Sequence, residues 1–216
     1  MYIKPIGNMQ THLHRRKNTG FDGNLATKTE VASAPYPGLR FKYEGAFQFK
    51  SGETIEQLEI AYETWGVLNA DASNAVLIFT GLSPSAHAKS SALDPRPGWW
   101  EEMIGPSAPI DTSRYFVVCL NHLGGCFGTT GPATVNCKTD EPYGITFPSL
   151  TMEDMAKAGR LLLSHLKIRC AEAVVGPSMG GLTALAFALE HPQAVRRLLL
   201  ISSAAQMSAR GIAIHG

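Results

Sequence analysis

The sequence predicts an α/β protein whose sheet is mostly parallel and flanked by helices. Short, nearly all-apolar runs recur along it, as is typical of parallel strands that are covered on both faces. Stretches of helical length alternate with these runs, and strand–helix–strand alternation builds a parallel sheet with right-handed crossovers. The chain has 216 residues, 44% of them hydrophobic, which is enough for one core and at most one complete domain.

The first elements are strands. Residues 39–52 alternate in strand fashion and break at Ser51-Gly52, which predicts a hairpin with residues 55–66. The apolar runs at 74–81 and 114–121 then predict two buried strands. The stretch between these two is rich in Pro and Gly and too long for a simple connector, and long loops at strand ends often carry function.

A helix is predicted over residues 151–168. Thr151 and Asp154 have the spacing of a capping box, in which each residue bonds the backbone N–H of the other. The expected apolar face of this helix consists of Met155, Ala158, Leu162 and Leu166.

The next strand is predicted over residues 171–176, followed by a helix over 179–192 and a further strand over 195–202. Residues 176–180 read GPSMG and match the pattern G-x-S-x-G. Its place between a strand and a helix is the context that makes this pattern informative. The pattern therefore predicts a sharp turn that lifts the Ser178 hydroxyl above the edge of the sheet.

We interpret Ser178 as a catalytic nucleophile. Small residues must flank it, because a side chain at either glycine would collide with the neighbouring strand or helix. The Met179 backbone N–H lies at the start of the helix, where it would stabilise an oxyanion. A second donor is expected from the loop after the strand at 74–79.

Charge and composition exclude several classes. With 19 basic and 18 acidic residues and no basic stripe, no nucleic-acid partner is expected. The apolar runs are shorter than the ~20 residues of a membrane span, so no membrane partner is expected either. The cysteines lack metal-site or disulfide spacing, so we expect no metal and a reduced, cytoplasmic protein. They are Cys119, Cys126, Cys137 and Cys170.

Residues 1–38 form a separate segment that we expect to be disordered or extended, because it has little apolar periodicity. It lacks the hydrophobic segment of a secretory signal, while its basic run at 14–17 leaves an organelle-targeting leader open. Residues 39–216 then make up the N-terminal part of a catalytic domain.

Several motifs together resemble the homoserine O-acyltransferases of the α/β-hydrolase superfamily. They are AYETWGVLNADASNAVLIF, GWWEEMIGPSAPIDTSRYFVVCLNHLGGCFGTTGPAT, PYGITFPSLTMEDM and VVGPSMGG. The resemblance implies an α/β-hydrolase fold and transfer of an acyl group from acyl-CoA, a co-substrate rather than a bound cofactor, to the hydroxyl of homoserine, in methionine or cysteine biosynthesis. It implies a Ser-Asp-His triad, a seryl acyl-enzyme, an oxyanion hole made by Leu82 and Met179, and a homodimer in full-length relatives.

The acyl donor is less sharply indicated. The stretches Thr80–Pro84 and Ala204–Gln206 are more similar to the branch that transfers succinyl groups to homoserine or serine than to the acetyl-transferring branch. We therefore favour succinyl-CoA and keep acetyl-CoA as the alternative. The residues that bind the substrate stay unknown.

The partners of the nucleophile are not apparent. In this superfamily the Asp or Glu and the His follow the serine, and the 38 residues after Ser178 contain only Glu190, His191 and His215 as candidates. Glu190 and His191 lie at the end of the predicted helix that Ser178 begins, about 18 Å from the serine. His215 lies in no family histidine motif. We therefore expect the chain to end near the sixth strand, without the triad Asp and His, and to turn over little or no substrate.

The remaining histidines give no better base. His122 follows the strand at 114–121 and is expected to line the pocket, His87 lies in the loop after the third strand, and His165 is expected on a helix surface. Two other functions stay open. One is an esterase on the same scaffold, and the other is an inactive fragment or half of a two-chain assembly.

Overall fold

The computed structural model describes residues 37–206, 209, 210 and 213. The expectation of a disordered or extended segment at 1–38 falls almost entirely outside the described residues, as does His215. Within the described residues, no helix is both long enough and apolar enough to cross a membrane.

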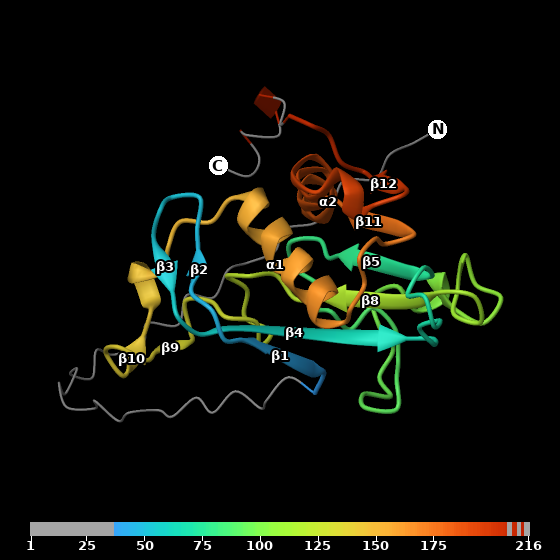
Figure 1. Cartoon of the computed structure of the whole chain (residues 1–216), viewed down its shortest axis with the longest axis horizontal. Coiled ribbons are helices and arrows are strands. Elements are labelled where there is room, and N and C mark those ends of the chain that lie inside the picture. Colours follow the sequence, from blue (N-terminus) through green and yellow to red (C-terminus); the bar gives the residue numbers. More distant parts are fainter. Residues whose placement is uncertain (1–36, 207–208, 211–212, 214–216) are drawn as a thin grey trace, which may run out of the picture. The chain divides into compact units, whose positions relative to one another are not determined.

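The described residues form a six-stranded sheet, which confirms the predicted α/β class (Figure 1). In spatial order its strands are β1 (Leu39–Tyr43), β4 (Leu58–Trp65), β8 (Phe116–Leu120), β5 (Ala75–Phe79), β11 (Ala173–Pro177) and β12 (Leu198–Ile201). Strand β4 is antiparallel to both β1 and β8, whereas β8, β5, β11 and β12 are parallel to one another. The carboxyl ends of these four strands therefore share one edge, which is where such sheets place their ligands.

Two helices, α1 (Met152–His165) and α2 (Met179–Glu190), pack on one face of this sheet (Figure 1). Their buried residues join one apolar cluster with Leu77 and Phe79 of β5. Helix α1 begins with the predicted capping box, since Thr151 accepts from the Asp154 N–H at 3.2 Å and Asp154 from the Thr151 N–H at 2.9 Å. These contacts fix the helix start one residue after the position that the sequence predicted.

The opposite face of the sheet is covered by the long segment that follows β5, rather than by a long helix. Val76 and Ile78 point to this face, where Trp99 and Trp100 pack over them. The segment contains a short 3₁₀ helix, η1 (Glu101–Met103), and the paired strands β6 (Ile104–Gly105) and β7 (Ile110–Asp111). It is thus a layer of the core as well as a loop at the end of a strand.

The hairpin predicted near the start is correct only in part. Strand β1 does pair with β4, but β2 (Phe47–Gln48) and β3 (Thr54–Ile55) form a small hairpin of their own. Phe47 of β2 and Ile55 of β3 are fully buried in the apolar cluster beneath the helices. Burial of these two side chains holds the small hairpin apart from the six-stranded sheet. The remaining elements are β9 (Val135–Asn136), β10 (Glu141–Pro142), η2 (Gly144–Thr146) and η3 (Pro192–Ala194).

Candidate active site

Ser178 occupies the turn between β11 and α2, as the sequence predicted. Its backbone has φ 53° and ψ −123°, a conformation that residues with a β-carbon rarely adopt. Its N–H donates to the Ile201 carbonyl of β12 at 2.9 Å. The residue is exposed at the carboxyl edge of the parallel strands, so its hydroxyl is open to a substrate.

Two of the neighbouring glycines allow this turn to exist. A β-carbon at Gly176 would lie 2.1 Å from the Gly180 carbonyl oxygen, and one at Gly180 would lie 2.2 Å from the Phe79 carbonyl oxygen. Both contacts are with backbone atoms, which cannot move aside as a flexible side chain does. The sequence-based reason for these glycines, a collision with the neighbouring strand or helix, therefore agrees with the geometry.

The two expected oxyanion donors belong to adjacent segments. Met179 is the first residue of α2, so its N–H has no acceptor within the helix. Leu82 follows the end of β5, and the close approach of Gly180 to Phe79 and Thr80 brings that end against the turn. The Leu82 side chain is 72% exposed. The arrangement provides the N-terminus of a helix and a neighbouring loop beside an exposed hydroxyl.

His122 connects this loop to the end of β8. Its Nε2 lies 2.6 Å from the Gly81 carbonyl oxygen and 2.8 Å from the Thr80 hydroxyl. A carbonyl oxygen only accepts, so Nε2 carries the proton and donates it to Gly81. Burial lowers the pKa of His122 although hydrogen bonding to the backbone opposes it, which favours the neutral ring. The residue lies at the predicted edge and supports the backbone that leads to Leu82.

A buried charged cluster, which sequence reasoning did not identify, fixes the same loop farther along. His87 Nδ1 lies 3.1 Å from the Glu63 carboxylate of β4, and its Nε2 lies 2.8 Å from the Arg96 carbonyl oxygen. Asp94 accepts from the Arg96 guanidinium, and Glu63 and Asp94 are 3% and 4% exposed. The pairing of Glu63 with His87 is not apparent from the sequence, because the two residues lie 24 positions apart.

None of the described residues forms a hydrogen bond with the Ser178 hydroxyl. Glu190 and His191 lie at the far end of α2, as predicted. His165 is exposed and stacks on Phe41. Within the described part of the chain, no group of three or more His, Cys, Asp or Glu residues could hold a metal ion.

Comparison with known proteins agrees with this architecture. Residues 74–212 match the family described as alpha/beta hydrolase fold. The chain is 53% identical over 169 residues to a serine O-succinyltransferase of Xanthomonas oryzae pv. oryzae, covering 78% of this chain and 42% of the relative. It is 50% identical over 180 residues to the serine O-succinyltransferase of Stenotrophomonas maltophilia, covering 83% of this chain and 49% of the relative. The chain thus spans about half the length of these curated relatives.

Solved structures of two similar proteins also agree with this architecture. A homoserine O-acetyltransferase from Bacillus anthracis is 34% identical with a TM-score of 0.73, covering 79% of this chain and 48% of that one. A solved esterase is also 34% identical with a TM-score of 0.75, covering 81% of this chain and 50% of that one. Acyl transfer and ester hydrolysis therefore both occur among proteins similar to this chain.

Proposed function

Because the chain belongs to the homoserine O-acyltransferase family of the α/β-hydrolase superfamily, we propose that it supplies the nucleophile of an O-acyltransferase. The acceptor is the hydroxyl of serine or homoserine, and the donor is an acyl-CoA. The observation that carries the proposal is the strained, exposed turn at Ser178 beside the loop that leads to Leu82.

In the first half of the proposed reaction, the Ser178 oxygen attacks the thioester carbonyl and forms a C–O bond. The resulting oxyanion accepts hydrogen bonds from the Leu82 and Met179 N–H groups. Collapse of this intermediate breaks the C–S bond, and the CoA thiolate takes the proton that left Ser178. A general base must carry that proton, and the family resemblance assigns this role to a histidine oriented by an aspartate.

In the second half, the acceptor hydroxyl attacks the seryl ester at its carbonyl carbon. A new ester C–O bond forms, the bond to Ser178 breaks, and the acceptor's proton returns to the Ser178 oxygen. The same two N–H groups stabilise the second oxyanion. Water competes with the amino-acid hydroxyl for this ester, so the pocket decides between transfer and hydrolysis.

We propose succinyl as the acyl group and serine as the first acceptor to test. Two observations support this choice. The relatives that are 50% and 53% identical are named serine O-succinyltransferases, and the stretches Thr80–Pro84 and Ala204–Gln206 are more similar to the succinyl branch. Acetyl-CoA and homoserine are the alternatives that the same assay compares.

The test is intact-mass analysis of the purified chain after incubation with succinyl-CoA or with acetyl-CoA. We expect a succinyl adduct that forms slowly, because no described residue hydrogen-bonds the Ser178 hydroxyl as a base would. Ser178→Ala should abolish this adduct, and serine should remove it slowly as O-succinylserine. Cys126 and Cys137 are exposed thiols, so neutral hydroxylamine treatment separates a thioester on cysteine from an ester on serine. A folded chain without an adduct, or an adduct that survives Ser178→Ala, contradicts the proposal.

Ester hydrolysis is the second candidate, because a solved esterase is as similar to this chain as the acetyltransferase is. The two are separated by measuring the loss of the seryl adduct with and without serine. An esterase loses its adduct at the same rate in both samples, whereas a transferase loses it faster when serine is present.

A further inference from the structure

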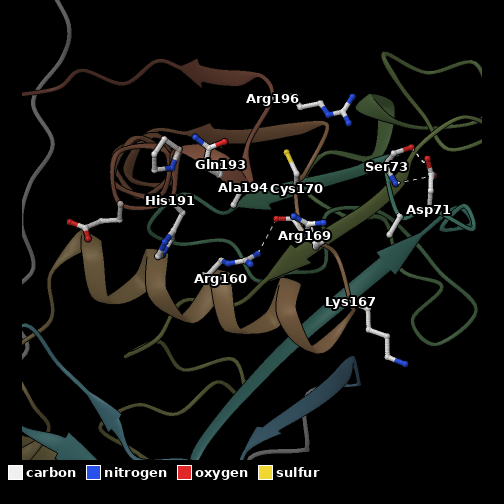
Figure 2. A pocket seen from close by; sticks show the side chains of 13 residues that line it. Asp71, Ser73, Arg160, Lys167, Arg169, Cys170, His191, Gln193, Ala194 and Arg196 are labelled. Carbon is white, nitrogen blue, oxygen red and sulfur yellow. Dashed lines mark hydrogen bonds between the residues drawn. The ribbon is translucent and has the colours of Figure 1, made fainter.

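A second concave site lies at the edge of the sheet opposite to Ser178. It is a cavity of about 600 Å³, lined by segments that directly precede β5, β11 and β12 and by one side of α1 (Figure 2). Helix α2 has 12 residues, with Ser178 before its first residue and the cavity at its last. The two sites are therefore about 18 Å apart along the helix, and the cavity is not part of the candidate active site.

The lining of this cavity is predominantly cationic. Four basic and two acidic residues line it, and one of the acids, Asp71, already accepts a hydrogen bond from the Ser73 hydroxyl at 2.9 Å. The other carboxylate belongs to Glu190. The basic residues are Arg160, Lys167, Arg169 and Arg196.

Two of the guanidinium groups lack an acidic partner. Among the described residues, Arg160 donates only to the carbonyl oxygens of Ile168 and Arg169, both at 3.3 Å, which places it against the backbone of the second arginine. Within the described ranges, neither Arg160 nor Arg169 has a carboxylate at ion-pair distance. Cationic groups that converge on a cavity in this way favour an anion between them.

His191 contributes a polar atom without a partner. Its Nε2 is buried and makes no hydrogen bond with any described residue. Burial lowers the pKa of His191, and the nearby Arg160 lowers it further although Glu190 opposes this, which favours the neutral ring. Buried polar atoms are nearly always hydrogen-bonded, so this nitrogen is available to a bound ligand. Figure 2 shows the His191 side chain directed from the end of α2 toward α1, where Arg160 lies.

The backbone that carries these side chains is held in place. The Ala171 N–H donates to the Ala194 carbonyl at 2.9 Å, and the Arg196 N–H donates to the Ala171 carbonyl at 3.0 Å. The segments before β11 and β12 are therefore bonded to each other, and Ala194 is buried between the helices and the sheet. The cavity is thus formed by the fold and not by flexible side chains alone.

We propose that this cavity binds a phosphate-bearing small molecule. The planar fork of arginine matches phosphate oxygens, and the neutral His191 ring adds one donor when its Nε2 carries the proton. A volume of about 600 Å³ falls among the ~300–1,000 Å³ of small-molecule sites and exceeds what one phosphate fills. The ligand therefore carries its phosphate against Arg160, Arg169 and His191, with an organic part in the remaining space.

The test is a titration of the purified chain with pyrophosphate at low ionic strength, followed by ¹H–¹⁵N NMR. We expect saturable shifts confined to the amides of 167–172, 190, 191 and 193–196. Adenosine diphosphate and adenosine are titrated in parallel, and we expect the diphosphate to bind and adenosine alone not to. Binding by adenosine but not by pyrophosphate would overturn the proposal.

Two variants remove one positive charge each. Arg169→Gln lies in the cavity, where its exposed side chain supports no other described contact, and we expect it to weaken pyrophosphate binding about tenfold. Lys42→Gln lies on β1, at the far end of the sheet order, where its side chain is 78% exposed, and we expect less than a twofold effect. Equal weakening in both variants, or no saturable shift, would show that no site exists. Ser178→Ala should bind pyrophosphate like the wild type, so this test is independent of the proposed acyl transfer.

Discussion

Replacing Gly180 with alanine tests how tightly the catalytic turn is packed. The new β-carbon would lie 2.2 Å from the Phe79 carbonyl oxygen and 2.5 Å from that of Thr80. Both are backbone atoms, so β5 and α2 must separate by about 1 Å before ordinary contact is restored. Overpacking typically costs ~1–3 kcal/mol, and a contact this short with an immobile partner belongs at the upper end. We therefore expect Gly180→Ala to lower the free energy of unfolding by about 3 kcal/mol.

The measurement is urea denaturation followed by circular dichroism, with the free energy extrapolated to zero denaturant. Gly81→Ala is the matched control, since its β-carbon would meet nothing closer than 3.7 Å, and Gly81 lies next to the same turn. We expect the control to change the free energy of unfolding by no more than about 0.5 kcal/mol. Equal stability of the two variants would refute the reasoning from backbone contact.

Two further predictions concern stability. Burial lowers the pKa of His87, but hydrogen bonds to the Arg96 carbonyl and to Glu63 outweigh it and raise the pKa overall. The stability that this ion pair adds is therefore complete below the unfolded value of about 6.5 and is lost as the pH rises through the folded value. The urea midpoint should therefore fall less between about pH 6 and about pH 8 in His87→Gln than in the wild type. An unchanged fall would mean that other groups cause the loss of stability. Asp154→Ala removes one half of the capping box of α1, the acceptor of the Thr151 N–H, together with the acceptor of the Lys50 N–H at 2.8 Å. Thermal melts should therefore show a loss of about 2 kcal/mol. An equal loss in the neighbouring Glu153→Ala would contradict a capping role.

Features encoded by local spacing could be predicted from the sequence. The apolar run before Ser178, the two glycines beside it and the helix after it are contiguous, so the pattern itself specifies the turn. The capping box of α1 was predictable for the same reason, because its two residues lie three positions apart.

Features that depend on distant contacts could not be predicted. Nothing near His87 indicates that Glu63, in a different strand, would become its partner. The side chains that line the basic cavity come from α1 and from segments before three strands. Each of its arginines, Arg160, Arg169 and Arg196, resembles an ordinary surface residue when taken alone. Their convergence arises from the strand order, which local periodicity does not specify.

The hydrogen bond from the Ser178 N–H to the Ile201 carbonyl has a consequence for the lifetime of the site. Strand β12 pairs with β11 from Leu198 to Ile201, and the Ser178 hydrogen bond continues this pairing beyond the end of β11. Proteins open locally more often than they unfold globally, and the ends of paired segments are among the parts that open. Each such opening would release the Ser178 amide and allow its backbone to leave the strained conformation. Amide hydrogen exchange at Ser178 would therefore measure how often the nucleophile loses its working geometry.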